Sequence, residues 1–125
     1  MNNYLYQEET YEIIGKCIEV HKNLGAGFLE IVYKDALEFE FKKVNISFER
    51  EVKYEVNYKE VILPHYFYAD FVVFDKIILE VKALSKGFAD EHIAQGINYL
   101  KVSGNKLALL VNFGETSLKQ KRIIL

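Results

Sequence analysis

Residues Tyr66–Leu84 read YFYADFVVFDKIILEVKAL, and this stretch decides the fold. Its first half, Tyr66–Phe74, is dense in aromatic and β-branched residues, which are typical of a buried strand. Asp75 and Lys76 mark a tight turn, and Ile77–Ala83 is the next apolar run. The stretch therefore predicts two buried strands that are neighbours in the chain.

Seven further elements are predicted on either side of these two strands. They are helices over Ile13–Leu24, Leu29–Phe41 and Asp90–Gly104, and strands over Phe48–Val56, Val61–Leu63, Leu107–Val111 and Arg122–Leu125. The helices carry apolar residues at spacings of three and four, whereas Phe48–Val56 alternates with a period of two. Pro64 is expected to interrupt the short strand, because proline cannot donate to a strand ladder.

The predicted order of the elements is α-α-β-β-β-β-α-β-β. The helix between Ile77–Ala83 and Leu107–Val111 is long enough for a right-handed crossover between parallel strands. The predicted fold class is therefore an α/β sandwich with a mixed central sheet flanked by helices. With 125 residues of even composition, residues 1–125 are expected to form a single domain.

Composition narrows the class of protein. Hydrophobic residues make up 50% of the chain, which excludes a disordered chain, and no apolar run approaches the ~20 residues that span a bilayer. Met1–Tyr6 lacks the basic and apolar segments of a signal peptide, and the single Cys17 cannot form an internal disulfide. A cytoplasmic location without a membrane partner is therefore expected. The net charge of -2 argues against a module that coats nucleic acid by charge alone.

Charged residues inside the two apolar strands are the most informative anomaly. Asp70 lies within the first strand, and Glu80 and Lys82 lie within the second, two apart and therefore on one face. Buried carboxylates are costly unless they are paired or bind a metal. The pattern Glu-x-Lys also begins at Glu40 and Glu51, but only the copy at Glu80 is embedded in apolar residues with an Asp ten positions upstream. The alternative interpretation is a solvated charge cluster on an open face.

The turn between the two strands decides whether these charges meet. Directly opposed residues of an antiparallel hairpin share a face, and Asp70 and Glu80 are an even number of positions apart. They share a face only if the loop has an odd number of residues or if a bulge intervenes. We therefore predict a three-residue loop or a bulge around Asp75 and Lys76.

Two carboxylates and a lysine brought together in this way predict a specific chemistry. Carboxylate oxygens are the ligands that Mg²⁺ and Mn²⁺ prefer, and such a metal lowers the pKa of a bound water and neutralises charge on a phosphate. A lysine beside them would orient the attacking water or stabilise the charge of the transition state. Asp70, Glu80 and Lys82 are thus the parts needed to hydrolyse a phosphodiester.

Two polar pairs on the helices are candidates to line the same cleft. Gln95 and Tyr99 are four apart and project from one helix face, where Gln95 interrupts an apolar region and is expected to have a polar partner. Glu30 and Tyr33 are three apart in the first turns of the second helix. The alternatives are an ordinary surface pair and a glutamate that complements the helix dipole.

Residues Gly27–Tyr33 read GFLEIVY, which is the G-x-x-E-x-x-Y signature of the GxxExxY protein family. The chain resembles that family from about Tyr11 to Gly114, and the family looks like a compact branch of the PD-(D/E)XK nuclease superfamily. The likeness also rests on four further segments, which are Tyr68–Phe71, Leu79–Ala83, Gln95–Tyr99 and Leu109–Gly114. The resemblance implies the restriction-endonuclease-like form of the α/β sandwich.

The resemblance also implies a role for each matching residue of the strands. Asp70 and Glu80 would ligate Mg²⁺ or Mn²⁺, with the Val81 carbonyl as a third oxygen. Lys82 would be the catalytic lysine. Glu30 would complete the acidic site, either directly or through a metal-bound water.

Further positions follow from the same likeness. Gln95 and Tyr99 match the Q-x-x-x-Y element that lies beside the active site in RecB-like members of the superfamily, and Tyr33 of the signature is a further supporting residue. The sequence departs from the superfamily motif at Ala69, where the motif has Pro.

Lysines provide the nucleic-acid surface that the sequence predicts. Lys34 shares a helix with Glu30, and Lys86 follows Lys82 by four positions. The alternative is that they are ordinary solvated lysines. The chain has only two arginines, Arg50 and Arg122, for bidentate phosphate contacts.

Three functions remain open at this stage. The first is an Mg²⁺-dependent nuclease that acts on DNA, or on RNA, through Glu30, Asp70, Glu80 and Lys82. The second is a catalytically silent module that keeps the nuclease fold to bind nucleic acid or protein, with a homodimer among its expected assemblies. The third is a structural protein with a polar cluster.

Overall fold

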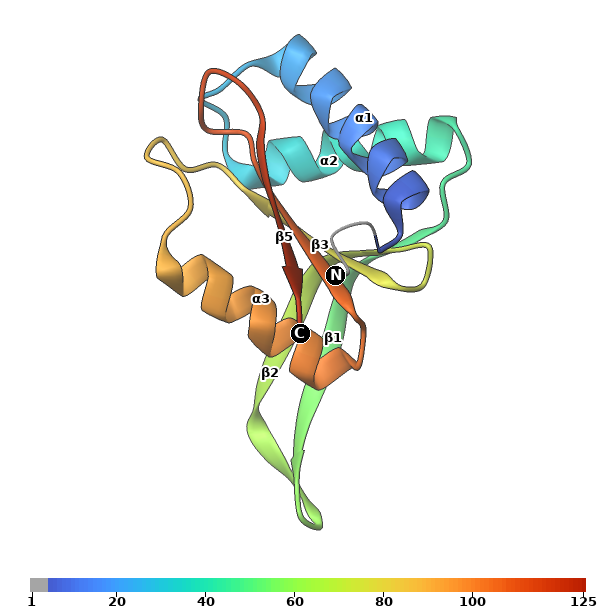
Figure 1. The fold of residues 1–125 in the computed structure, drawn as a ribbon, viewed down its shortest axis with the longest axis vertical. Coiled ribbons are helices and arrows are strands. Elements are labelled where there is room, and N and C mark those ends of the chain that lie inside the picture. Colours follow the sequence, from blue (N-terminus) through green and yellow to red (C-terminus); the bar gives the residue numbers. More distant parts are fainter. Residues whose placement is uncertain (1–4) are drawn as a thin grey trace.

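The computed structural model describes residues 5–125, which form one mixed sheet with helices on both of its faces (Figure 1). The elements are α1 (Gln7–Leu24), α2 (Glu30–Lys43), β1 (Phe48–Tyr58), β2 (Val61–Val73), β3 (Ile77–Lys82), α3 (Asp90–Ser103), β4 (Leu107–Asn112) and β5 (Lys119–Ile124). The strands follow the order β1-β2-β3-β4-β5 across the sheet. Only β3 and β4 are parallel, and α3 makes the crossover between them. The predicted fold class, a mixed sheet flanked by helices, is confirmed.

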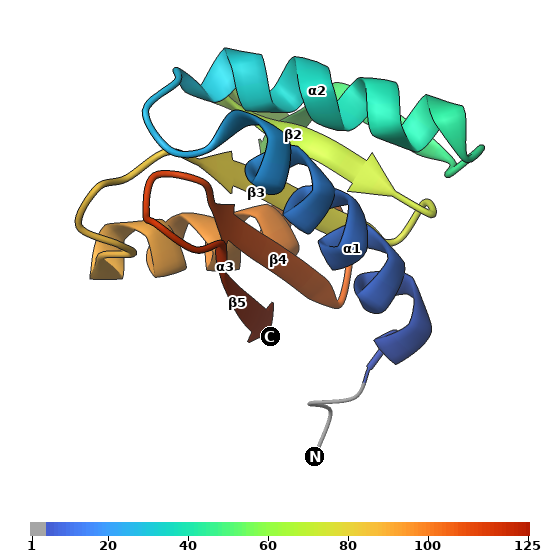
Figure 2. The same ribbon diagram turned by 90° about the horizontal axis from the view of Figure 1, so that it is seen from above.

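Helices α1 and α2 lie on one face of the sheet and α3 lies on the other (Figure 2). A hydrophobic core lies on each face. On one face, α1 and α2 cover Ile77, Leu79 and Val81 of β3. On the other face, Ile78 of the same strand packs with Leu100 of α3. Because both faces are covered, β3 and β4 need apolar residues at almost every position, and they therefore read as continuous apolar runs.

The predicted number of strands is corrected by the structure. Val61–Val73 is one continuous strand, so the order of elements is α-α-β-β-β-α-β-β, with one strand fewer than predicted. The register of β1 and β2 shifts between Glu55 and Asn57, at the level of Pro64. A bulge is one of the few places in a sheet where proline is tolerated, because no ladder hydrogen bond is required of it there. Pro64 therefore interrupts the pairing without ending the strand.

The loop between β2 and β3 has the length predicted from the sequence. Val73 pairs with Ile77, which leaves the three residues 74–76 in the loop. Phe74 and Asp75 both have positive φ angles, of 56° and 60°. An odd loop length places Asp70 opposite Glu80, which is the arrangement that the candidate site requires.

The connection after β3 is held tightly against the end of β4. Asn112 is fully buried, and its side chain exchanges hydrogen bonds of 2.7 and 2.8 Å with the backbone of Leu84. Gly114 lies so close to this connection that a Cβ atom there would be 2.4 Å from the nitrogen of Leu84 and 2.6 Å from the carbonyl carbon of Ala83. Both contacts are with backbone atoms, which cannot move aside as a flexible side chain can.

Gly114→Ala is therefore expected to lower the free energy of unfolding by about 3 kcal/mol, the upper end of the usual cost of overpacking. Urea denaturation monitored by circular dichroism measures the change. Gly15→Ala is the matched control, because a Cβ at Gly15 of α1 meets no atom within 4 Å and alanine favours the helix. Equal stability of the two variants would contradict the close approach at Gly114.

Within residues 5–125, none of the helices combines the length and the apolar character needed to cross a membrane.

Candidate functional site

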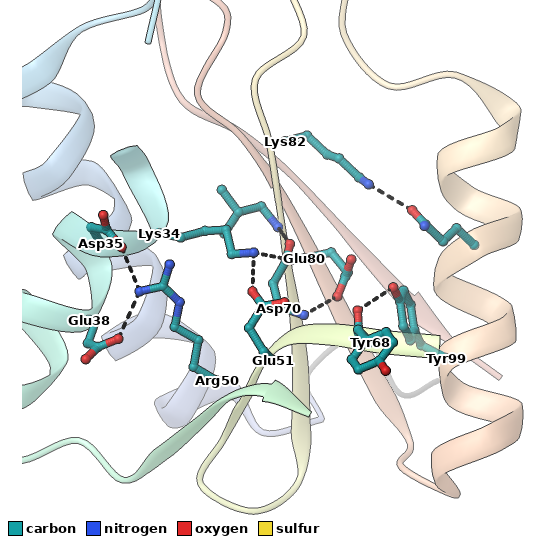
Figure 3. A network of polar contacts seen from close by, with 12 residues as sticks. Lys34, Asp35, Glu38, Arg50, Glu51, Tyr68, Asp70, Glu80, Lys82 and Tyr99 are labelled. Atoms are coloured by element: carbon teal, nitrogen blue, oxygen red, sulfur yellow. Dashed lines mark hydrogen bonds and ion pairs between the residues drawn. The ribbon is translucent and has the colours of Figure 1, made fainter. Parts of the chain in front are cut away.

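The ladder between β2 and β3 opens at Asp70 and Glu80. Regular pairing runs from Val73 with Ile77 to Phe71 with Leu79 and then stops. Beyond that point the Asp70 N–H donates to Oε2 of Glu80 at 2.8 Å, and the Val81 N–H donates to Oδ2 of Asp70, also at 2.8 Å (Figure 3). Each carboxylate thus accepts a hydrogen bond from the backbone of the opposite strand. The two acidic side chains are brought together where they replace the missing backbone acceptors.

The neighbouring strand β1 has a kink at the same level, opposite Asp70. Pairing is interrupted at Glu51 and Asp70, and Glu51 has a φ angle of 56°, which is unusual for a residue other than glycine. Phe48 packs on the side of α1 and α2, whereas Val52, four residues later, packs on the side of α3. Residues an even number apart in a regular strand share a face, so β1 changes faces at Glu51. Backbone strain of this kind is often retained at functional sites.

Helix α2 places the side chain of Lys34 against the kink of β1 at Glu51. Lys34 Nζ donates to Oδ1 of Asp70 at 2.9 Å and also forms an ion pair with Glu51 (Figure 3). Only 9% of Lys34 is exposed, so it is not the surface lysine that the sequence predicted. Burial by itself lowers the pKa of Lys34, but its hydrogen bonds to Glu51 and Asp70 outweigh burial and hold that pKa above its ordinary value. The ammonium is therefore charged and is a cation held between two carboxylates.

Glu80 is the more deeply buried of the two acids in the β2–β3 opening, with 3% of the residue exposed. Burial, and then the negative charge of Asp70, raise the pKa of Glu80 to about 8. At neutral pH the side chain is therefore largely protonated. A cation bound between Glu80 and Asp70 would oppose both causes, because it favours the ionised form of Glu80.

Asp70 and Glu80 suit a hard divalent cation that takes few ligands from the protein and keeps water molecules as the others. Within residues 5–125, no three side chains of His, Cys, Asp or Glu come close enough together to hold a metal ion. Asp70 and Glu80 are a pair, and Mg²⁺ commonly binds through one or two carboxylates while keeping several waters. The third oxygen predicted from the Val81 carbonyl remains a prediction, although the Val81 N–H orients Asp70.

Helix α3 supports the site from the opposite face of the sheet. Lys82 Nζ donates to Oε1 of Gln95 at 2.8 Å, which confirms that Gln95 has a polar partner. The Tyr99 hydroxyl donates to the Tyr68 carbonyl at 2.7 Å, two residues before Asp70 (Figure 3). One turn of α3 therefore holds Lys82 of β3 near Glu80, and it holds the backbone of β2 near Asp70.

The G-x-x-E-x-x-Y segment forms the end of the loop before α2 and the first turn of that helix. Gly27 has a φ angle of 114°, which a residue with a side chain rarely adopts. The Tyr33 hydroxyl donates to the Gly25 carbonyl at 2.6 Å and accepts from the Phe28 N–H at 3.2 Å, while its ring stacks on Phe113. Tyr33 thus ties the loop between α1 and α2 to the core and fixes where α2 begins.

Glu30 is the first residue of α2, one helical turn before Lys34. It lines an open hollow of about 550 Å³ together with Phe28, Leu29, Ile31, Lys34 and Ala83. In the described part of the chain, Glu30 does not join Asp70 and Glu80 in a group able to hold a metal. Lys34 is the residue that connects the hollow with Asp70. The contribution of Glu30 to the acidic site, either directly or through a metal-bound water, therefore stays a prediction.

Three other basic residues are candidates for phosphate contacts, namely Lys86, Arg50 and Arg122. Lys86 is exposed in the connection between β3 and α3. Arg50 pairs with Asp35 and Glu38, and Arg122 contacts Thr10 and the Leu5 carbonyl. Both arginines are thus committed to intramolecular contacts.

Sequence reasoning missed Glu51, although it is one of the two acids that hold Lys34. The alternation of β1 indicated a strand with one wet face, and the Glu-x-Lys pattern that begins at Glu51 was set aside because it is not embedded in apolar residues. The positive φ angle that aims Glu51 at Lys34 leaves no signal in the residue type, since glycine and asparagine are the residues that commonly mark such positions.

Comparisons with known proteins agree with this fold. The family model of the PD-(D/E)XK nuclease superfamily matches residues 7–123. The crystal structure of SSO0001 is similar in fold, with a TM-score of 0.61 and 22% sequence identity over 95% of the chain. The chain spans 59% of the length of that protein. No curated protein gives a significant sequence match. Since the family match covers almost the whole chain and includes both β2 and β3, the chain belongs to the PD-(D/E)XK nuclease superfamily.

Proposed function

We propose that this protein is a divalent-metal-dependent nuclease of the GxxExxY type that hydrolyses phosphodiester bonds, with DNA as the expected substrate and RNA as the second. The observation that carries the proposal is the opening of the β2–β3 ladder, where Asp70 and Glu80 meet and bond to each other's strands. Nucleases of this superfamily generally use divalent metals, which supports Mg²⁺ or Mn²⁺ as the cofactor.

Each residue of the site would have a distinct task. Asp70 and Glu80 would hold the cation, which when bound supplies charge neutralisation and an acidified water. Lys82 extends from the same strand as Glu80, two residues on, and Gln95 fixes its ammonium. That ammonium would stabilise the negative charge that develops on the phosphate. Tyr99 would keep the backbone before Asp70 in place.

The test is a cleavage assay on single-stranded and double-stranded DNA and RNA with Mg²⁺, Mn²⁺ or EDTA. Cleavage is expected with either metal, none with EDTA, and a loss of activity in Asp70→Asn and Glu80→Ala. Asp75→Asn is the matched control, because it makes the same chemical change at an exposed residue five positions away. Absence of metal-dependent cleavage, or cleavage that survives both substitutions in the site, would refute the proposal.

A catalytically silent module of the same fold is the second candidate, and one observation favours it. Lys34 pairs with Asp70, so one of the two acids already has a cationic partner from the protein itself. A silent module would bind nucleic acid or a protein partner, as a monomer or a homodimer. It is distinguished by the Asp70→Asn variant, which should bind the partner as tightly as the unmodified protein.

A further inference from the structure

Lys34 is shared between an inner and an outer carboxylate. The side chain of Asp70 is 15% exposed and that of Glu51 is 48% exposed, while the side chain of Lys34 is 11% exposed. Glu51 therefore reaches toward solvent, and Asp70 lies deeper, against β3. The ammonium stands between the two, so it can be held by both or by the outer one alone (Figure 3).

Both oxygens of Asp70 are already in use. Oδ2 accepts the Val81 N–H, and Oδ1 accepts Lys34 Nζ at 2.9 Å. A divalent cation bound to Oδ1 would lie within a few ångströms of the ammonium, where two like charges repel strongly in a partly buried site. The repulsion therefore makes the lysine and the divalent cation competitors at this oxygen.

We propose that Lys34 and the divalent cation are alternative partners of Asp70, and that Glu51 retains the ammonium when the cation takes Asp70. This inference rests on the proposed function, because it assumes that Asp70 is a metal ligand. Lys34 is thus a positioning residue that neutralises Asp70 in the metal-free protein and withdraws from it on metal binding.

The surroundings of Lys34 allow this movement. Lysine carries a point charge on a flexible stem, so it can exchange partners without moving its backbone. Lys34 also lines the open hollow with Glu30, one helical turn before it, so there is open space beside its side chain. The kink of β1 places Glu51 within reach of the ammonium, which gives its positive φ angle a function.

Calorimetric titration with Mn²⁺ tests the inference on the intact chain, with Lys34→Met, Glu51→Gln, the double variant and Asp70→Asn. Lys34→Met should bind Mn²⁺ about tenfold more tightly or more, because the competing ammonium is gone. Glu51→Gln should bind more weakly, because Lys34 is left with Asp70 alone. In the double variant the effect of Glu51→Gln should largely disappear, since no lysine remains to be retained.

Thermal melting supplies a second readout. Lys34→Met should melt at a lower temperature than the unmodified protein in EDTA, because it leaves Asp70 and Glu51 without a cation. Saturating Mn²⁺ should raise the melting temperature of Lys34→Met by more than it raises that of the unmodified protein. Lys42→Met on the same helix is the control, because its ammonium pairs with Glu38 instead.

The possible outcomes separate this inference from the proposed function. If the unmodified protein binds Mn²⁺, Asp70→Asn does not, and Lys34→Met binds no more tightly, the metal site stands and the inference is overturned. If Glu51→Gln weakens binding equally with and without Lys34, Glu51 acts on the cation directly and the inference is likewise overturned. If neither the unmodified protein nor Lys34→Met binds Mn²⁺, both proposals fail.

Discussion

Lys82→Met is expected to lower the rate of metal-dependent cleavage by about 100-fold or more, while Mn²⁺ still binds. Removing one preorganised charge from a catalytic site typically costs two to three orders of magnitude in rate. Lys82 is preorganised in this sense, because Gln95 holds its Nζ at 2.8 Å. Methionine keeps much of the length and apolar character of the lysine stem, so the change removes the charge with little loss of packing.

Single-turnover cleavage with saturating Mn²⁺ measures this effect, and titration calorimetry measures metal binding on the same samples. Lys43→Met is the matched control, since it removes an exposed lysine in the last turn of α2. Gln95→Ala should give a smaller loss than Lys82→Met, because the ammonium remains but is no longer oriented. Full activity of Lys82→Met would remove Lys82 from the chemistry and leave only a metal-binding role for β3.

Glu80→Gln is expected to stabilise the metal-free protein at pH 7 to 8 by on the order of a few kcal/mol. The pKa of Glu80 is raised from 4.5 to about 8 in the folded protein, mainly by burial and then by the charge of Asp70. Between these two values the folded chain keeps a proton that the unfolded chain has lost. The free energy of unfolding therefore falls as the pH rises from about 4.5 to about 8. Glutamine is neutral at every pH and its carbonyl can still accept from the Asp70 N–H, so the variant should lose most of this pH dependence.

Urea denaturation in EDTA at half-unit steps from pH 5 to pH 8.5 measures the slope for each protein. Glu60→Gln is the control, because Glu60 is exposed in the turn between β1 and β2. The unmodified protein in saturating Mn²⁺ should also lose most of the slope, because the cation favours ionised Glu80 in the folded state. A steep slope that persists in Glu80→Gln would mean that another group is responsible for it.

Local rules of sequence were sufficient for much of this fold. A three-residue loop or a bulge was predicted from the parity of Asp70 and Glu80, on the condition that they share a face, and the pairing of Val73 with Ile77 shows the three-residue loop. The parallel pairing of β3 and β4 was predicted from the length of the helix between them, and it is also confirmed. Both predictions concern elements that are close in the chain, where spacing constrains geometry directly.

The predictions that failed depended on contacts with other segments. Lys34 looked like a surface residue of α2, because nothing in its own helix shows that Asp70 and Glu51, which are distant in the chain, lie beneath it. Pro64 interrupts the pairing, but the strand continues past it, because Pro64 lies where β1 and β2 shift register. In each case the local pattern was read correctly, but a partner segment outside that pattern altered its meaning.

The mutual hydrogen bonds of Asp70 and Glu80 also change what an intact motif can tell us. Because each carboxylate accepts a hydrogen bond from the backbone of the other strand, both acids have a structural role that does not depend on any reaction. A descendant of such a chain that no longer turned over substrate would still need these acids to keep two strands joined. A survey that identifies enzymes by this aspartate and glutamate will therefore also count proteins that have kept the fold without the activity. The lysine is the better residue by which to tell the two groups apart.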